Sequence, residues 1–176
     1  SLFFTEGKEG FGSAAFLQAN TLYIYGCELD RESLTKPCRL ARVPIASILD
    51  KSAWTFYSGS GNWSSNLNES EIVFNGNEMM SVFYSSYVSA YIAVYSKPMS
   101  HQVMLRASNS PEGPWSSPVE VFVAKDSATE LGWIYDALAH PELSQDNGRI
   151  IYITYSRNTA AFDSELRLVT VELAPA

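Results

Sequence analysis

The feature that most constrains the fold is a pattern of short apolar segments that repeats along the chain. Arginine stands at comparable places in the third segment of each group, at Arg42, Arg106 and Arg167, with intervals of 64 and 61 residues. Trp54 and Trp115, which open the fourth segments, are also 61 residues apart. A steady period with four strands per unit is typical of β-propeller blades. We therefore predict an all-β chain that holds about three four-stranded blades.

The expected strands are runs rich in Val, Ile, Tyr and Phe, bounded by clusters of Gly, Asn, Ser and Pro. They form three groups, at 13–17, 22–27, 38–44 and 54–57, then 79–84, 91–95, 102–108 and 119–123, then 134–138, 150–156 and 165–173. Residues 44–51, with Pro44 near the start, give the best helix signal and predict about two turns. Residues 146–148 (Asp-Asn-Gly) predict a hairpin turn.

The length of 176 residues suits one domain with a sizeable core, and we assign 1–176 to a single partial propeller. The approximate blades are 11–60, 70–124 and 130–174. Three blades do not close a ring, because a propeller needs roughly four or more. A β-sandwich is the alternative, since many short strands with turn signals also suit that fold.

Charge and hydropathy exclude several classes of partner. The net charge of −7 argues against nucleic acid, because neutralising phosphates requires clustered cations. Anionic membrane surfaces are disfavoured for the same reason, and no apolar run is long enough to span a bilayer. The N-terminal residues lack the pattern of a secretory signal peptide, which is a cationic segment followed by an apolar segment and a cleavage site. We therefore expect residues 1–4 to be the trimmed start of a mature chain.

The two cysteines, Cys27 and Cys38, each lie beside an expected strand. A hairpin joining those strands would bring the thiols within bridging range, and the bond would stabilise the fold by roughly 3 kcal/mol. Two buried free thiols are the alternative. Neither the spacing nor histidine partners support a metal site, and we predict no cofactor.

Two acceptor triplets for N-glycosylation, at Asn62 and Asn68, lie in one polar stretch. They predict a glycosylated surface loop, although chance occurrence is the competing explanation for such short motifs.

The run from Val103 to Phe122 contains the most specific motif of the chain. Its pattern, Arg-Ala-x-x-x-Pro-x-Gly-Pro-Trp-Ser-x-Pro, resembles the outer hairpin of a blade in the arabinanase-like five-bladed β-propellers. Residues 75–84 with 90–95 resemble the inner strands of that family, and 134–143 with 149–158 are similar to its last blade.

The resemblance implies a secreted, carbohydrate-active protein that binds a carbohydrate ligand. It also implies that the chain corresponds to the C-terminal three blades of a five-bladed ring, which an N-terminal fragment or a second copy would complete. Active members of the family cleave glycosidic bonds with carboxylates from the first strands of different blades. Their catalytic base generally comes from the first blade, which this chain lacks, so the chain would hold an incomplete catalytic set.

Two carboxylates are the catalytic candidates. Asp136 lies in the first strand of the last blade, where a structural hydrogen bond would explain it equally well. Glu71 precedes the apolar residues 72–74, and a solvated loop residue is the competing interpretation. The candidates for substrate binding are Trp133, His140, Arg157, Tyr87 and Tyr91.

These five residues offer the contacts that sugars use: aromatic faces for stacking and polar groups for hydroxyls. Two of them also have a structural explanation. His140 could be a hydrogen-bonded histidine at the end of a strand, and Arg157 could form a salt bridge between blade edges. Trp54 and Trp115 are assigned to blade packing.

Three functions remain open on this reasoning. The first is a glycoside hydrolase or its remnant, the second is a non-catalytic lectin, and the third is a propeller for structural or protein interactions. Loops rich in aromatic, Ser and Asn residues suit the first two equally.

Overall fold

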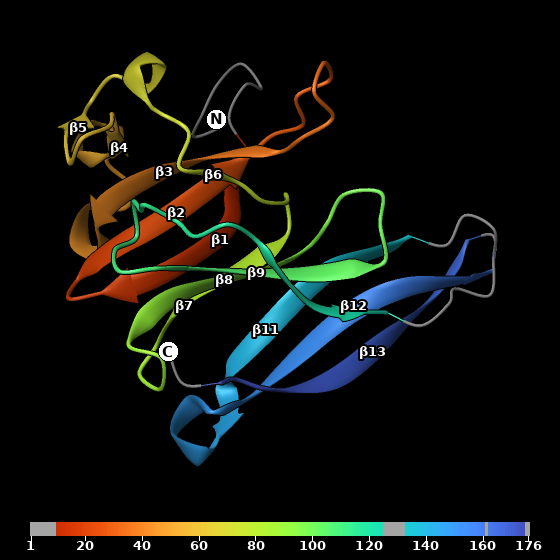
Figure 1. Ribbon diagram of the computed structural model, residues 1–176. Coiled ribbons are helices and arrows are strands. Elements are labelled where there is room, and N and C mark those ends of the chain that lie inside the picture. The colour runs from red at the N-terminus through yellow and green to blue at the C-terminus, as the bar shows by residue number, and fades with distance from the viewer. Residues whose placement is uncertain (1–9, 125–132, 161, 175–176) are drawn as a thin grey trace. The chain divides into compact units, whose positions relative to one another are not determined.

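The computed structural model describes residues 10–124, 133–160 and 162–174. Every strand pairing in these ranges is antiparallel, and the remaining regular structure consists of short 3₁₀ turns, which confirms the predicted all-β class. The chain divides into two compact units, Ser1–Glu78 with Pro111–Pro114, and Met79–Ser110 with Trp115–Ala176 (Figure 1). Each unit is described by itself.

The first unit is built on one sheet in which successive strands pair in the order β1-β2-β3-β4-β5, with β6 paired to β3. The strands are β1 (Phe11–Gln18), β2 (Thr21–Cys27), β3 (Pro37–Pro44), β4 (Thr55–Tyr57), β5 (Trp63–Ser64) and β6 (Phe74–Asn75). The first four match the first predicted group closely. The apolar residues 72–74 lead into β6, a short strand that lies outside the predicted groups.

One face of this sheet forms a compact core. Ile24, Ala41, Val43 and Phe56 alternate inward along β2, β3 and β4, and Trp54 packs against them. The Trp54 indole N–H donates to the carbonyl of Ile48 at 3.1 Å, so its polar atom is satisfied where its ring is buried. The predicted packing role of Trp54 is confirmed.

The helix predicted over 44–51 is wrong. Two 3₁₀ turns, Ile45–Ser47 and Lys51–Ala53, occupy this region. The carboxylate of Asp50 accepts hydrogen bonds from the backbone N–H of Ser52 at 2.9 Å and from its hydroxyl at 2.7 Å. Such local side-chain bonds offer the backbone an alternative to continued helix, and the chain turns here into β4.

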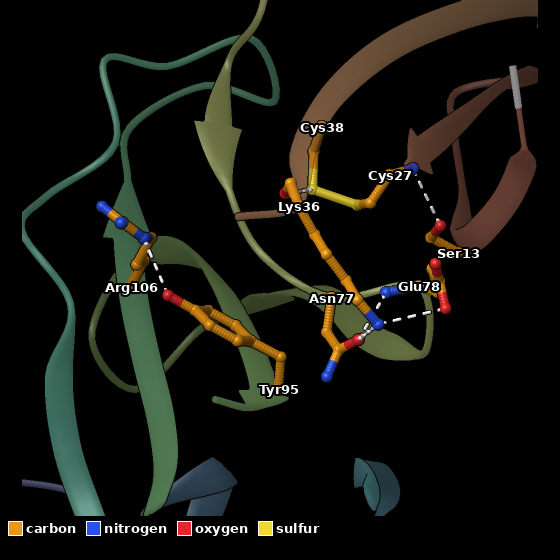
Figure 2. Close-up of a disulfide and its surroundings, with 8 residues drawn as sticks. All are labelled: Ser13, Cys27, Lys36, Cys38, Asn77, Glu78, Tyr95 and Arg106. Carbon is orange, nitrogen blue, oxygen red and sulfur yellow. Dashed lines mark hydrogen bonds and ion pairs between the residues drawn. A yellow bond between two sulfur atoms is a disulfide. The ribbon is translucent and has the colours of Figure 1, made fainter. Parts of the chain in front are cut away.

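Cys27 and Cys38 form a disulfide, as predicted. The two residues pair directly across β2 and β3, with a Cα–Cα distance of 4.0 Å, so the bond closes the loop between these strands. Figure 2 shows the bond beside Lys36, whose ammonium group contacts Asn77 Oδ1 at 2.8 Å and Glu78 Oε2 at 3.0 Å. Covalent and polar links therefore hold both ends of this loop.

The second unit contains two sheets, and their strands follow the remaining predicted groups. The four-stranded sheet has the order β10-β9-β8-β7, and the three-stranded sheet has the order β11-β12-β13. The strands are β7 (Met80–Ser85), β8 (Ala90–Ser96), β9 (Gln102–Ser108), β10 (Val119–Val123), β11 (Ile134–Gln145), β12 (Ile150–Ala160) and β13 (Asp163–Glu172). The turn predicted at 146–148 lies between β11 and β12, with Asn147 at φ 57°.

The two sheets of this unit share one core. Ile92, Val94 and Val103 from the first sheet pack with Ile151 and Ile153 from the second. The leading strands also touch, because β11 contacts both β7 and β8. Sheets packed face to face with their first strands adjacent are what successive blades require.

The three repeated arginines occupy equivalent strands. Arg42, Arg106 and Arg167 lie on β3, β9 and β13, the third strand of each sheet. Arg42 lies over the Trp63 ring at 3.9 Å, and Arg106 Nε donates to the Tyr95 hydroxyl at 3.0 Å, as Figure 2 shows. The repeat in the sequence is therefore a repeat in strand position, while the blade bounds of 11–60, 70–124 and 130–174 stay predictions.

The hairpin that carries the family-like motif has the predicted strands. β9 and β10 begin and end as expected, and the backbone N–H of Ser116 donates to the carbonyl of Ala107 at 2.8 Å between them. The turn residues Pro111–Pro114 belong to the first unit, where the Tyr25 hydroxyl donates to the carbonyl of Pro111 at 2.6 Å.

Candidate functional site

Asp136 lies on β11, the first strand of its sheet, at an irregularity in the strand pairing. The register passes from Tyr135 opposite Ser156 to Leu138 opposite Thr154, so the strand carries an extra residue there. Asp136 has φ 56°, a left-handed conformation that is strained for a residue with a side chain. Bulges of this kind turn a side chain in a new direction and are frequent beside active sites.

The carboxylate of Asp136 is half-buried and makes no hydrogen bond or ion pair with the residues that the structure describes. The structural hydrogen bond that was the alternative for Asp136 is not found among the described residues. Backbone strain around an unpartnered acid instead suits a group held ready for a ligand.

Two further predicted residues lie at the same end of β11. Trp133 immediately precedes the strand with 51% of its surface exposed, and Arg157 on β12 pairs with Ile134. Between them, the Tyr135 hydroxyl donates to Asn158 Oδ1 at 3.0 Å. The fold therefore gathers an exposed indole, a carboxylate and polar side chains at one end of two neighbouring strands.

Arg157 has a partner across the sheet. Its Nε donates to Oε1 of Glu165 on β13, and Arg167 Nη2 contacts the same oxygen at 2.6 Å. Hydrogen bonds from Arg157, then from Arg167, hold the pKa of the Glu165 carboxyl below its usual value. Arg157 therefore forms an ion pair, as its alternative expected, but within one sheet and not between blade edges, and the sugar-binding role of this residue stays a prediction.

His140 lies farther along β11 and uses both ring nitrogens. Nδ1 lies 2.9 Å from Glu142 Oε1, and Nε2 lies 2.8 Å from Thr154 Oγ1. The pKa of the Glu142 carboxyl is lowered by its own backbone N–H and then by His140. His140 is thus hydrogen-bonded through both ring nitrogens, as the competing interpretation expected, but it lies within β11 and not at the end of a strand.

The predicted tyrosines lie toward the other end of β11. Tyr87 is in the turn between β7 and β8, and a Cβ built on Gly148 would lie 3.6 Å from its Cβ. Tyr91, the first residue of the predicted strand 91–95, is the second residue of β8, with only 5% of its surface exposed. Its ring meets Tyr84 edge-to-face at 5.2 Å, so pairing with β7 draws it into the sheet.

A cavity of about 360 Å³ lies beside these turns. Tyr84 and Ser86 border it from the β7 side, and Pro141, Ser144 and Asn147 border it from the β11 side. It is remote from Asp136 along β11. The structure therefore divides the predicted residues into two groups, with Asp136, Trp133 and Arg157 at one end of the strand and Tyr87 beside this cavity.

Glu71 lies in the first unit, just before the short strand β6. Its backbone N–H donates to the carbonyl of Tyr57 on β4, the fourth strand, and its side chain is exposed. The segment that follows pairs with β3 through Phe74 and Cys38, which keeps it in the first sheet. The carboxylate rests against Gly59, where an added Cβ would lie 2.3 Å from Oε2. The catalytic role of Glu71 stays a prediction.

Asn62 and Asn68 are both exposed, as glycosylation would require. No cluster of three or more His, Cys, Asp or Glu within 10–124, 133–160 and 162–174 could hold a metal ion. The same ranges contain no helix with the length and apolar character that a membrane span requires.

Similar solved structures define the class of this fold. A putative hydrolase from Bacteroides ovatus ATCC 8483 matches with a TM-score of 0.66 at 16% identity, over 91% of this chain and 41% of that chain. An α-L-arabinofuranosidase from Podospora anserina, solved with cellotriose, matches with a TM-score of 0.54 at 11% identity, over 95% of this chain and 49% of that chain. An exo-β-1,3-galactanase from Phanerochaete chrysosporium matches with a TM-score of 0.51 at 11% identity, over 96% of this chain and 39% of that chain.

The chain therefore shares its fold with part of each of these three structures, which agrees with the all-β resemblance predicted from the sequence. The chain belongs to the family described as "Domain of unknown function (DUF4185)", which matches residues 1–161. It spans less than half the length of each of these solved structures. No curated protein matches its sequence significantly.

Proposed function

We propose that this chain is part of a secreted, carbohydrate-active β-propeller and that Asp136 acts on a glycosidic bond. The observation that carries the proposal is the unpartnered carboxylate of Asp136 on a strained bulge of a leading strand. The hydrolase-type fold agrees with it. Trp133 offers an exposed aromatic face for stacking on a sugar ring at the same end of the strand.

Hydrolysis of a glycosidic bond needs two carboxyl groups. One protonates the leaving oxygen, and the other activates water or attacks the anomeric carbon. Asp136 supplies one of these groups. In this proposal the second comes from blades outside this chain, carried by an N-terminal fragment or a second copy that completes a five-bladed ring. The coverage of less than half of each solved structure supports this division.

A sugar-binding protein without catalysis is the second candidate. The observation that favours it is that Asp136 is the only one of the two predicted catalytic carboxylates that the structure places on a leading strand. A single carboxylate with an exposed indole and hydrogen-bonding neighbours suffices to hold a sugar.

One pair of assays tests the proposal. Glycan-array binding is measured for this chain, and release of reducing ends from arabinan and related polymers is measured for the chain joined to its flanking blades. Asp136→Asn keeps the shape and removes the charge, and Asp163→Asn is the matched control on an exposed aspartate of β13. We expect Asp136→Asn alone to abolish release.

The other outcomes are equally informative. Binding without release in every protein would support the lectin. Neither binding nor release would refute a carbohydrate function and would favour an interaction propeller.

A further inference from the structure

A second cavity, of about 330 Å³, opens in the first unit at the end of the sheet where β2 and β3 are joined. Three segments surround it: the start of β1, the loop between β2 and β3, and residues 67–70. Its volume lies in the lower part of the range of small-ligand sites. None of the sites predicted from the sequence for catalysis or sugar binding lies here.

The walls of this cavity are fixed before any ligand arrives. The Cys27–Cys38 disulfide closes the base of the loop, and the Cys27 backbone N–H donates to Ser13 Oγ at 3.0 Å. Farther out, Asp30 accepts hydrogen bonds from the backbone of Glu32 at 3.0 Å and from Ser33 Oγ at 2.6 Å. These bonds also hold the pKa of the Asp30 carboxyl below its usual value. A pre-ordered loop lowers the entropic cost of binding.

Three polar side chains bring unused hydrogen-bonding capacity to the cavity. Arg39 directs Nη1 to the carbonyl of Ser70, and its Nε and Nη2 make no hydrogen bond within the described part of the chain. The Glu28 carboxylate and the Asn68 side-chain amide likewise have no partner there. A guanidinium, a carboxylate and an amide thus face one small space.

The mixture of charges selects the class of ligand. Glu28 and Asp30 together outweigh the attraction of Arg39 for an anion. A metal ion would be attracted by the two carboxylates but opposed by Arg39, and no group of three or more His, Cys, Asp or Glu that could hold one lies here among the described residues. A neutral polyhydroxylated molecule meets neither repulsion, because each hydroxyl donates to a carboxylate and accepts from a guanidinium or amide. Phe11 and Leu67 add apolar wall for the C–H face of a ring.

We propose that this cavity binds one neutral sugar unit, held by Glu28 and Arg39, with the Asn68 amide as a further contact in the protein without a glycan on Asn68. The site would anchor a saccharide without cleaving it, and it requires no contribution from Asp136. This site therefore goes beyond the proposed function, and it can be tested independently of that function.

The test measures binding of L-arabinose, D-galactose, D-glucose and D-xylose by ligand-observed NMR and calorimetry. Glycine, sulfate and Ca²⁺ are measured alongside as zwitterionic, anionic and cationic probes. Glu28→Gln should weaken sugar binding about tenfold or more, because it removes a charged hydrogen-bond acceptor. Glu32→Gln is the matched control, since this exposed residue of the same loop does not line the cavity and only its backbone N–H bonds to Asp30.

A second variant protects the test against a local folding defect. Arg39→Lys keeps the positive charge but loses the paired donors of the guanidinium, and it should also weaken binding. Failure of all four sugars to bind, or equal affinities in Glu28→Gln and Glu32→Gln, would overturn the proposal. Binding of glycine in place of sugars, or sugar binding lost only in Asp136→Asn, would overturn it as well. The last result would leave the proposed function intact.

Discussion

The hydroxyl of Ser81 on β7 is hydrogen-bonded to both backbone groups of Ala139 on β11. It accepts from the Ala139 N–H at 2.8 Å and donates to the Ala139 carbonyl at 3.2 Å. One side chain thus joins the leading strands of the two sheets in the second unit. Ala139 lies three residues beyond Asp136, so the same contact fixes the strand that carries the proposed site.

Ser81→Ala should destabilise the protein by about 1–3 kcal/mol, because it leaves two largely buried backbone groups without a partner. Urea denaturation of the variant measures the loss. Ser117→Ala is the control, since this exposed serine lies outside the strands. Equal midpoints for the two variants would show that the contact contributes nothing.

Reduction of the Cys27–Cys38 disulfide should lower the free energy of unfolding by roughly 3 kcal/mol, because the unfolded chain regains the freedom of the closed loop. Thermal melts with and without reductant measure the effect. The Cys27→Ser, Cys38→Ser double variant should lose a similar amount and should not respond to reductant. A reductant effect that persists in this variant would contradict the assignment.

The ion pairs of Glu165 should make the stability of the second unit depend on pH. Its carboxyl has a lowered pKa in the folded state, because Arg157 and Arg167 donate to the charged form. The stabilisation is complete above the usual value of 4.5 and disappears as pH falls through the lowered value. Glu165→Gln should therefore melt below the wild type at pH 7, and the difference should shrink toward pH 3.

Glu32→Gln controls for general charge effects in that titration, because the Glu32 side chain is exposed and its neighbour Asp30 receives only its backbone N–H. A difference between wild type and Glu165→Gln that stays constant from pH 7 to pH 3 would disprove the role of the ion pair.

Asp136→Gly tests whether the bulge is strained. Glycine adopts φ 56° without steric cost, so the variant should gain about 1 kcal/mol of stability while polysaccharide binding at the Asp136 end of β11 is lost and monosaccharide binding in the cavity around Arg39 is unchanged. Asp163→Gly is the contrasting variant, since that strand residue has no positive φ and should lose stability. Calorimetric melts combined with the glycan array give both readouts. A clear loss of stability in Asp136→Gly would argue that the acid is structural.

The strands of this protein were predictable because their signals are local. Alternating apolar residues and turn clusters located β9 and β10 at both ends, and two cysteines beside neighbouring strands located the disulfide. The end of β11 was missed, since Pro141 suggested an early stop, whereas the strand continues to Gln145.

Contacts that depend on strand register were beyond local reasoning. Thr154 meets His140 only because β12 pairs with β11 in one alignment, and Tyr91 is buried only because β8 pairs with β7. The place of Glu71 followed from a long-range pairing of β6 with β3. The cavity around Arg39 likewise forms where segments distant in the sequence meet, so no single sequence motif predicts it.

The separation between Asp136 and the cavity near Tyr87, both on β11, limits which ligands can reach both places. Asp136 and Ser144, which borders the cavity near Tyr87, lie between Tyr135 and Gln145. The partners of those two residues, Ser156 and Ile150, are six residues apart on β12, so Asp136 and Ser144 are separated by less than about 20 Å along the sheet. A monosaccharide reaches only one of these places. A polymer several units long can occupy both, and the length of an oligosaccharide, rather than the identity of its terminal sugar alone, then sets how tightly it is retained.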